Sequence, residues 1–325
     1  MNTLTPEINN FNPEPEIILK AAKILKSGGL VAFPTETVYG LGANALNPDA
    51  VKKIYEAKCR PSDNPLILHM CSFEQAEKFV YMNDLAEKLI KIFSPAPLTL
   101  VLKSKPVVPL ITRGNLDTAA IRIPNNPVAL ALIEAAEIPI AAPSANLSGR
   151  PSPTDFESVF ADMNGRIDMI LNAGSVDVGI ESTVIDVSNP EKILMLRPGG
   201  MSRNLIENAL GKKIEVPDKN SLKKSPGTRY KHYAPNIPVK IFKPDLDLKD
   251  INSAAFIGLH EPDLNFKSKI IFKDVKNYAR GLFAAFRKFE SEKFSCIVAE
   301  LPDNNSGGIC EGLRDRLSRA AGVCV

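Results

Sequence analysis

The chain has 325 residues, which at about 150 residues per domain predicts two domains. Hydrophobic residues make up 44% of the sequence and charged residues 24%, which is enough apolar material for packed cores and excludes a largely disordered protein. The formal net charge is only +3, from 40 basic and 37 acidic residues, whereas a polybasic nucleic-acid binder would be far more one-sided.

The cysteines and histidines form neither a disulfide framework nor a metal-binding pattern. The five cysteines contain no C-x-x-C pair, and none of the three histidines lies four residues from another. Residues 1–20 lack an apolar signal core, and the most apolar stretch, residues 128–142, is interrupted by two glutamates and a proline. We therefore expect a soluble cytoplasmic protein with no metal site and no membrane contact.

Helical and strand patterns alternate over the first two hundred residues. Short buried strands are predicted at residues 29–33, 65–70, 98–102, 118–123, 138–142, 169–171, 182–187 and 193–196. Helices are predicted at residues 17–26, 48–58, 84–93, 127–136 and 202–210. This alternation predicts an α/β fold. Because the later strands follow one another without helices between them, we expect a twisted mixed sheet.

The chain changes character after residue 211. Residues 212–238 are rich in lysine and proline, as in a solvated linker, yet residues 225–235 (SPGTRYKHYAP) carry three aromatic or imidazole rings. Beyond them, strands are predicted at residues 239–242, 254–259, 269–272 and 295–300, with helices at residues 276–293 and 307–321. We expect three parts: an α/β domain (12–211), a linker segment (212–238) and a smaller, three-layer Rossmann-like domain (239–325).

The segment Gly40–Ala45 (GLGANA) matches the dinucleotide fingerprint G-x-G-x-x-A, but its surroundings do not. Pro34 ends the strand before it, and Asn47-Pro48 delays the next helix, whereas the fingerprint joins a strand directly to a helix. The sequence contains no P-loop either. We interpret these glycines as a tight turn that allows close approach of the backbone.

Two cations lie in the loop at residues 58–65 (KCRPSDNP), between a predicted helix and a predicted strand. Lys58 and Arg60 could complement the negative end of the helix dipole. They could equally bind a phosphate or a carboxylate, because arginine presents a planar fork of donors and lysine a mobile charge. The residues alone leave both interpretations open.

A second polar loop, residues 142–152 (APSANLSGRPS), follows a predicted strand, which favours a ligand site over a simple polar turn. Thr118 and Arg122 share one side of their strand because they are four residues apart. Arg122 and Arg197 should each be paired, either with a ligand carboxylate or with an internal acid. Three acids could form an acid–base pair, but no spacing singles them out: Glu36, Glu181 and Asp186. We interpret them as structural residues or as residues that support the side chains in contact with a ligand.

Several blocks in order along the chain resemble the YrdC-like family. They are FPTETVYGLG (33–42), KCRP (58–61) followed by PL (65–66), APSANLSG (142–149) and STV (182–184). The length of the chain and residues 225–235 look like the long, two-domain form of that family, and the resemblance covers about residues 17–236. It implies a twisted α/β catalytic domain whose concave, positively charged face holds the substrates.

The resemblance also implies an activity, the synthesis of threonylcarbamoyl-AMP and pyrophosphate from L-threonine, bicarbonate and ATP. The product serves the formation of threonylcarbamoyladenosine in tRNA, so tRNA, or the tRNA threonylcarbamoyltransferase that accepts the product, is an implied candidate partner. ATP would be a substrate, with Mg²⁺ bound through its phosphates. No covalent nucleophile is implied.

The residue roles implied by the resemblance fall into three sets. The catalytic cations would be Lys58 and Arg60. L-Threonine would be bound by Thr35, His69, Arg122, Ala142 and Ser182. ATP would be bound by Lys58, Ser62, Thr118, Ser144, Ser152, Arg197 and Asn236. Residues 225–235 would fold over the nucleotide as a lid that excludes water.

Two other functions stay open at this point. One is an RNA-binding factor without catalysis, which would use the basic concave surface and the lysine-rich segment. The other is a carbamoyltransferase that shares the YrdC-like module. The hydrogenase-maturation form of that enzyme would need cysteine-rich zinc motifs, and this chain has no C-x-x-C.

Overall fold

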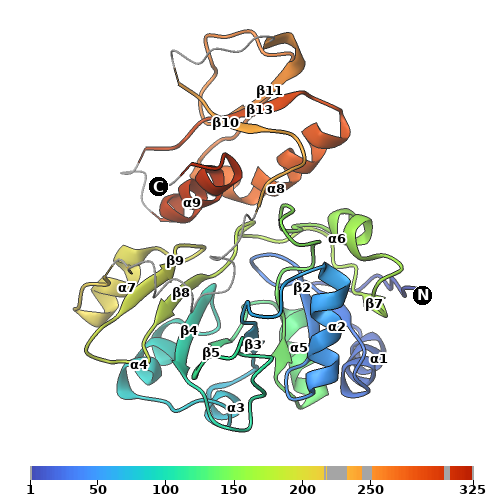
Figure 1. The fold of residues 1–325 in the computed structure, drawn as a ribbon, viewed down its shortest axis with the longest axis vertical. Coiled ribbons are helices and arrows are strands. Elements are labelled where there is room, and N and C mark those ends of the chain that lie inside the picture. The colour runs from blue at the N-terminus through green and yellow to red at the C-terminus, as the bar shows by residue number, and fades with distance from the viewer. Residues whose placement is uncertain (1, 216, 218–232, 244–250, 304–307, 324–325) are drawn as a thin grey trace.

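Two β-sheets, built from consecutive parts of the chain, organise the protein in the computed structural model of Figure 1. The structure describes residues 2–215, 217, 233–243, 251–303 and 308–323. Most of the predicted lid, residues 225–235, lies outside these ranges, and the described chain resumes at Tyr233. Among the described residues, no helix has the length and apolar composition needed to cross a membrane.

The first sheet has nine strands in the order β7-β1-β2-β6-β3-β5-β4-β8-β9. Antiparallel pairs such as β1–β2 occur beside parallel pairs such as β3–β5, so the predicted mixed sheet is confirmed. The strands are β1 (Val31–Phe33), β2 (Gly40–Asn44), β3 (Ile67–His69), β4 (Leu98–Lys103), β5 (Thr118–Arg122), β6 (Ile140–Ala141), β7 (Met169–Ile170), β8 (Thr183–Asp186) and β9 (Leu194–Arg197).

Seven helices accompany this sheet in the described part of the chain: α1 (Pro15–Lys26), α2 (Pro48–Lys58), α3 (Phe73–Ala76), α4 (Asp84–Phe93), α5 (Pro127–Ala136), α6 (Phe156–Met163) and α7 (Arg203–Leu210). Most begin at a polar residue whose side chain accepts from a backbone N–H group of the first turn, as Asn126 does for α5. The sequence did not predict α3 and α6, which are too short to show a clear helical period.

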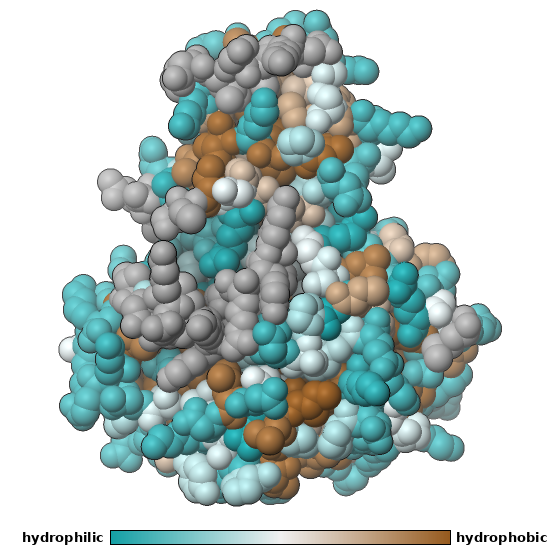
Figure 2. All heavy atoms as spheres, viewed as in Figure 1, coloured by the Kyte–Doolittle hydropathy of each residue, from teal (hydrophilic) through white to brown (hydrophobic). Residues whose placement is uncertain are grey.

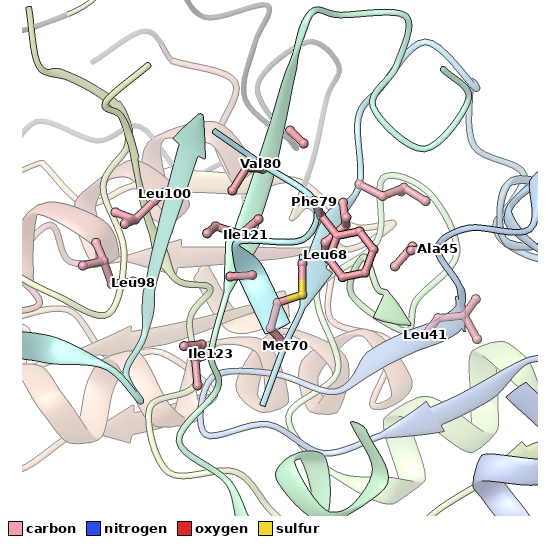
Figure 3. Packing of buried hydrophobic residues seen from close by; sticks show 14 of the residues in the cluster. Leu41, Ala45, Leu68, Met70, Phe79, Val80, Leu98, Leu100, Ile121 and Ile123 are labelled. Carbon is pink, nitrogen blue, oxygen red and sulfur yellow. The ribbon is translucent and has the colours of Figure 1, made fainter. Parts of the chain in front are cut away.

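The two faces of the first sheet are covered differently. Leu68, Leu100 and Ile121 lie together on one face, where α2, α4, α6 and α7 add to the largest apolar cluster (Figure 3). On the opposite face α1 and α5 pack over β1, β6 and β7. The rest of that face, from β3 to β9, carries a small apolar cluster that includes Ile67 and Ala120. The site described below lies on this part of the sheet.

The prediction of a tight turn at Gly40 and Gly42 was wrong, because both glycines lie in strand β2. Their small size is nevertheless required. A Cβ atom at Gly42 would lie 2.8 Å from Cε1 of Phe33 and 2.9 Å from Cγ2 of Ile140. The glycines therefore let β2 pass close to the Phe33 ring, which agrees with the other half of the prediction, close approach.

The second sheet is parallel, with the strand order β10-β13-β11-β12. Its elements are β10 (Val239–Ile241), the 3₁₀ turn η2 (Ile251–Ser253), β11 (Ala254–Gly258), β12 (Ser268–Ile271), α8 (Val275–Ser291), β13 (Cys296–Ala299) and α9 (Cys310–Ala320). Both helices pack on one face, whereas the other face is covered by loop side chains such as Phe266. The described residues thus form two layers rather than the expected three. Hydrophobic side chains of this domain reach its front surface in Figure 2.

Helices α8 and α9 dock the C-terminal domain on the first domain (Figure 1). A Cβ atom at Gly179 would lie 2.2 Å from Cα of Arg280 in α8. One at Gly312 in α9 would lie 2.7 Å from the carbonyl oxygen of Gly199. Such approaches of backbone to backbone tolerate no side chain and fix the position of both helices.

Candidate active site

A cavity lies where four strands of the first sheet end, and it is partly closed by the C-terminal half of the chain. Its walls come from the β1–β2 connection, the loop before β3, the ends of β3, β5 and β9, and the segments after β6 and before β8. The lining residues are Thr35, Thr37, Val38, Gly40, Arg60, Pro65, Leu66, Ile67, His69, Arg122, Ala142, Pro143, Ser144, Glu181, Ser182, Arg197 and Tyr233.

All five residues assigned to L-threonine by the resemblance line this cavity: Thr35, His69, Arg122, Ala142 and Ser182. The sheet itself brings them together, because His69 pairs with Arg122 across β3 and β5. Ala142 follows β6 and donates its N–H to the carbonyl oxygen of Ile67 at 2.9 Å. The strand register therefore places residues that are far apart in the sequence on one wall.

Arg122 is paired with an internal acid, one of the two kinds of partner that the sequence left open. Its Nη2 lies 2.7 Å from Oε2 of Glu36 and donates to Oγ1 of Thr37 at 2.9 Å. Both charged side chains are buried, and their attraction offsets part of the cost of removing them from water. The Nε of Arg122 is buried without a hydrogen-bond partner among the described residues, so the guanidinium keeps unused donor capacity.

His69 is neutral at ordinary pH. Burial and the positive charge of Arg122 lower the pKa of this imidazole from 6.5 to about 3. The ring meets Phe33 edge to face at 6.1 Å, and its Nδ1 lies 3.2 Å from the carbonyl oxygen of Ile67. An imidazole in this state can orient a polar substrate group without adding a charge to the cavity.

Three candidates for the nucleotide side also line the cavity: Arg60, Ser144 and Arg197. Burial lowers the pKa of Arg60 from 12.5 to about 10, which still leaves the group positively charged at neutral pH. Arg197 donates from Nε and Nη2 to the carbonyl oxygen of Ser182, at 3.1 and 2.9 Å. Together with Arg122 these side chains make the cavity wall rich in positive charge, as a site for anions requires.

Lys58 takes a position that the sequence did not predict. It is buried at the end of α2 outside the cavity lining, and its Nζ donates to the carbonyl oxygens of Ser144 and Asn146, each at 2.5 Å. Burial, reinforced by the charge of Arg60, lowers the pKa of this amine well below its ordinary value. In this structure Lys58 fastens the loop that carries Ser144.

The other four ATP candidates lie outside the cavity lining. Ser62 and Asn236 are exposed, and the backbone N–H of Asn236 donates to Oε1 of Glu290 at 2.8 Å. Thr118 is buried at the start of β5. Ser152 is also buried and donates to Oε1 of Glu181, which does line the cavity.

The sequence missed two features of the wall. Glu181, which we took as structural, faces the cavity. Tyr233 closes the cavity from the C-terminal side, is buried, and has a φ of 70°, a strained value for a bulky residue. The three rings in residues 225–235 were the available signal for Tyr233. No cluster of three or more potential metal-binding side chains occurs in the described ranges.

Comparisons with known proteins agree with this architecture over the whole chain. Residues 23–199 match the Sua5/YciO/YrdC family model, described as "Telomere recombination". Residues 201–322 match the model described as "Threonylcarbamoyl-AMP synthase, C-terminal domain". The chain is 42% identical to the threonylcarbamoyl-AMP synthase of Bacillus subtilis, over 98% of this chain and 96% of that protein. It belongs to the Sua5 family of threonylcarbamoyl-AMP synthases.

Solved structures of the Sua5 family support the same assignment. The crystal structure of Pyrococcus abyssi Sua5 complexed with L-threonine has a TM-score of 0.91, with 40% identity and coverage of 98% of both chains. Escherichia coli YciO matches 60% of this chain and 95% of its own, with a TM-score of 0.55 and 26% identity. The shorter protein thus resembles only part of the present chain.

Membership of the Sua5 family decides among the functions that the sequence left open. The chain is an enzyme, a nucleotidyltransferase that forms threonylcarbamoyl-AMP with ATP as a substrate. A non-catalytic RNA-binding factor and a carbamoyltransferase built on the same module are set aside, because the match to the synthases extends through both domains.

Proposed function

We propose that the cavity described above is the place where L-threonine, bicarbonate and ATP are converted to threonylcarbamoyl-AMP and pyrophosphate. One observation carries the proposal: five threonine candidates and three nucleotide candidates, drawn from distant parts of the sequence, line a single cavity. The L-threonine complex of Pyrococcus abyssi Sua5, a protein of the same fold matched over 98% of both chains, supports the assignment of the amino acid.

On the threonine side, Arg122 binds the substrate carboxylate. Its buried guanidinium is held by Glu36 and Thr37 and retains donor capacity at Nε. Thr35, Ser182, the neutral His69 and the backbone at Ala142 orient the hydroxyl and amino groups. The neutral amine condenses with bicarbonate to give the carbamate and water, and the carbamate carries the attacking oxygen.

On the nucleotide side, Arg60 and Arg197 bind phosphates, and Ser144 contributes a hydroxyl. The carbamate oxygen attacks the α-phosphorus of ATP, the bond to the β-phosphate oxygen breaks, and pyrophosphate leaves. Positioning two anions and stabilising the leaving charge require no protein nucleophile. Mg²⁺ would be bound through the phosphate oxygens of ATP rather than by Glu181, because that carboxylate is already ion-paired with Arg316 at 2.6 Å.

Other assignments belong to the same proposal. Lys58 acts through the loop that it fastens, and ATP reaches Ser62, Thr118, Ser152 and Asn236 as it extends beyond the cavity. Residues 12–211 form the main part of the catalytic domain, residues 212–238 the linker or lid, whose first residues still pack on that domain through Ile214, and residues 239–325 the C-terminal domain. The backbone N–H of Ala234 donates to the carbonyl oxygen of Gly149 at 3.1 Å. This hydrogen bond supports a lid whose described end lies against the polar loop at residues 142–152. The enzyme works in the cytoplasm and supplies its product for tRNA modification.

The test is an assay of pyrophosphate release with each substrate omitted in turn and the adenylate identified by mass. We expect turnover to require both threonine and bicarbonate, because the attacking oxygen belongs to their carbamate. Serine should react roughly 10- to 200-fold less efficiently if the pocket contacts the threonine methyl group. Equal ATP breakdown without threonine would refute the proposal.

A further inference from the structure

A charged side chain from the C-terminal domain is buried behind the cavity wall. Arg316, on α9, has no exposed surface. Its Nε donates to Oε2 of Glu181 at 2.6 Å, and its Nη1 donates to the carbonyl oxygen of Pro198 at 3.1 Å and to Oδ2 of Asp315 at 2.6 Å. A buried guanidinium is stable only with such partners, so these hydrogen bonds hold the positive charge of Arg316 next to Glu181.

The position of Arg316 is fixed by the way α9 docks. Gly312, one turn earlier on α9, lies backbone to backbone against Gly199, leaving no room for a Cβ atom. Gly200 in turn donates its N–H to the carbonyl oxygen of Glu181 at 2.9 Å. The helix and the segment that carries Glu181 and Arg197 therefore form one rigid contact.

Glu181 lies between two positive charges. Burial raises the pKa of this carboxyl, but the charges of Arg316 and Arg197 outweigh it and hold the pKa below its ordinary value. Glu181 is therefore an anion inside a wall that should attract anionic phosphates. Arg197 lines the same cavity, so an unneutralised Glu181 would attract its guanidinium and repel ATP.

We propose that Arg316 is a positioning residue for ATP: it neutralises Glu181 from behind the cavity, so that this carboxylate offsets less of the positive charge that Arg197 presents to the phosphates. The inference rests on the proposed function, in which Arg197 binds ATP. It gives the C-terminal domain a role in the chemistry of a site that otherwise belongs to the first domain. The domain supplies one charge, and that charge sets the electrostatics of the nucleotide side.

A second contact of the same guanidinium agrees with this role. The Cζ of Arg316 lies 4.8 Å from the centre of the Tyr233 ring, the distance of a cation–π contact. Tyr233 lines the cavity and stacks on Phe283 of α8 at 5.8 Å. Arg316 thus touches two cavity-lining residues, Glu181 and Tyr233, from outside the cavity.

The experiment compares Arg316→Met, Glu181→Gln and the double variant in the full-length enzyme. KM for ATP is measured from pyrophosphate release at saturating threonine and bicarbonate, and KM for threonine at saturating ATP. We expect Arg316→Met to raise KM for ATP roughly tenfold or more, because Glu181 then competes for Arg197, with a smaller effect on KM for threonine. Adding Glu181→Gln should reverse most of that rise, which a purely structural role of Arg316 would not produce.

The control is Arg319→Met, one turn further along α9. Arg319 pairs with Asp315 at 2.9 Å and is partly exposed, and both KM values should stay unchanged. The inference would be overturned if folded Arg316→Met had an unchanged KM for ATP. It would also be overturned if the double variant had a KM for ATP as high as that of Arg316→Met.

If Arg316→Met does not fold, the double variant, which buries neither charge, decides the question. Its KM for ATP should lie closer to that of the unmodified enzyme than to that of Arg197→Met, and the reverse would overturn the inference. Arg197→Met also separates the two levels of the argument. A normal KM for ATP in that variant would refute the proposed nucleotide site itself. If KM for ATP were raised in Arg197→Met but normal in Arg316→Met, only the role of Arg316 would be refuted.

Discussion

The two sides of the cavity are built from different parts of the molecule. The threonine side consists of residues on or next to β1, β3, β5, β6 and β8, and all of its candidates meet on one wall. The nucleotide side combines loop residues with side chains held by the C-terminal domain. Several of its candidates lie outside the lining: Lys58, Ser62, Thr118, Ser152 and Asn236.

This difference shows which half of the site the first domain can provide alone. The hydrogen bonds of the sheet fix the relative positions of His69 and Arg122 whether or not a second domain is present, and Thr35 lies two residues after strand β1 of the same sheet. By contrast, Glu181 is neutralised by Arg316, and Tyr233 is held by α8 and α9. Threonine binding should therefore tolerate changes in the C-terminal domain that disrupt ATP binding.

The largest effect is expected from removing the C-terminal domain. The chain should end at Pro217 rather than at Gly211, because Ile214 is buried in the core of the first domain and Glu215 donates its N–H to the carbonyl oxygen of Ile193. We expect threonylcarbamoyl-AMP formation to fall by about 10³ or more, since Tyr233 and Arg316 are lost and water enters. Threonine binding, measured by calorimetry, should persist. A truncated protein that matches the full chain in rate and product yield would contradict the comparison.

A somewhat smaller effect is expected at two basic residues, Lys58 at the end of α2 and Arg60 just after it. Arg60→Ala should lower kcat by roughly 10²–10³, as expected for a lost, preorganised charge. Lys58→Ala should lower kcat by a comparable factor, because the loop that carries Ser144 loses the amine that holds it. Arg60→Ala should do so with little change in stability. Lys58→Ala should also lower the free energy of unfolding, because two buried carbonyl groups lose their donor.

The matched control for these cations is Lys52→Ala, because Lys52 lies on the exposed side of the same helix. It should change neither kcat nor the unfolding midpoint. If Arg60→Ala unfolded while its surviving folded fraction kept normal turnover, the charge would serve only the helix end.

The smallest effect concerns pH and the threonine side. His69 has a pKa of about 3 in the folded protein and 6.5 ordinarily, so between these values the unfolded chain binds a proton that the folded chain does not. Lowering the pH from 6.5 toward 3 should therefore reduce the free energy of unfolding by up to roughly 1.4 kcal/mol per pH unit. His69→Gln lacks this contribution. Urea unfolding of both proteins at pH 6.5, 5.5 and 4.5 should show the difference, and parallel pH profiles would contradict it.

The fold could be predicted where the sequence pattern was long or strongly apolar. Helices such as α4 show their period directly, strands such as β4 are mostly apolar, and the mixed sheet followed from the order of elements. Strand β2 was missed because Gly40 and Gly42 have the composition of a turn. The strand needs glycine at these positions because the ring of Phe33 packs against it. This tertiary contact cannot be recognised from the local sequence.

The candidate site could be predicted from sequence blocks only as a set of residues. The resemblance named Arg122 and His69. The sequence alone did not show that Glu36 would pair with Arg122. It also gave no sign that burial would keep the imidazole of His69 neutral. Lys58 was expected at a ligand and instead binds backbone carbonyl groups. The role of Arg316 could not be predicted from the sequence. It depends on the packing of two domains against each other, and such packing produces no periodic pattern of residues.

Calorimetric binding of L-threonine to Arg122→Met and Arg197→Met tests the two-sided site most directly. Arg122→Met should weaken threonine binding by roughly 100-fold or more, because a charge-assisted contact to the carboxylate is lost. Arg197→Met removes the donors to Ser182 but leaves Arg122 in place, so it should weaken threonine binding far less than Arg122→Met does, while its KM for ATP rises. If Arg197→Met lost threonine as completely as Arg122→Met, or if Arg122→Met still bound it normally, the division of the cavity into two sides would be wrong.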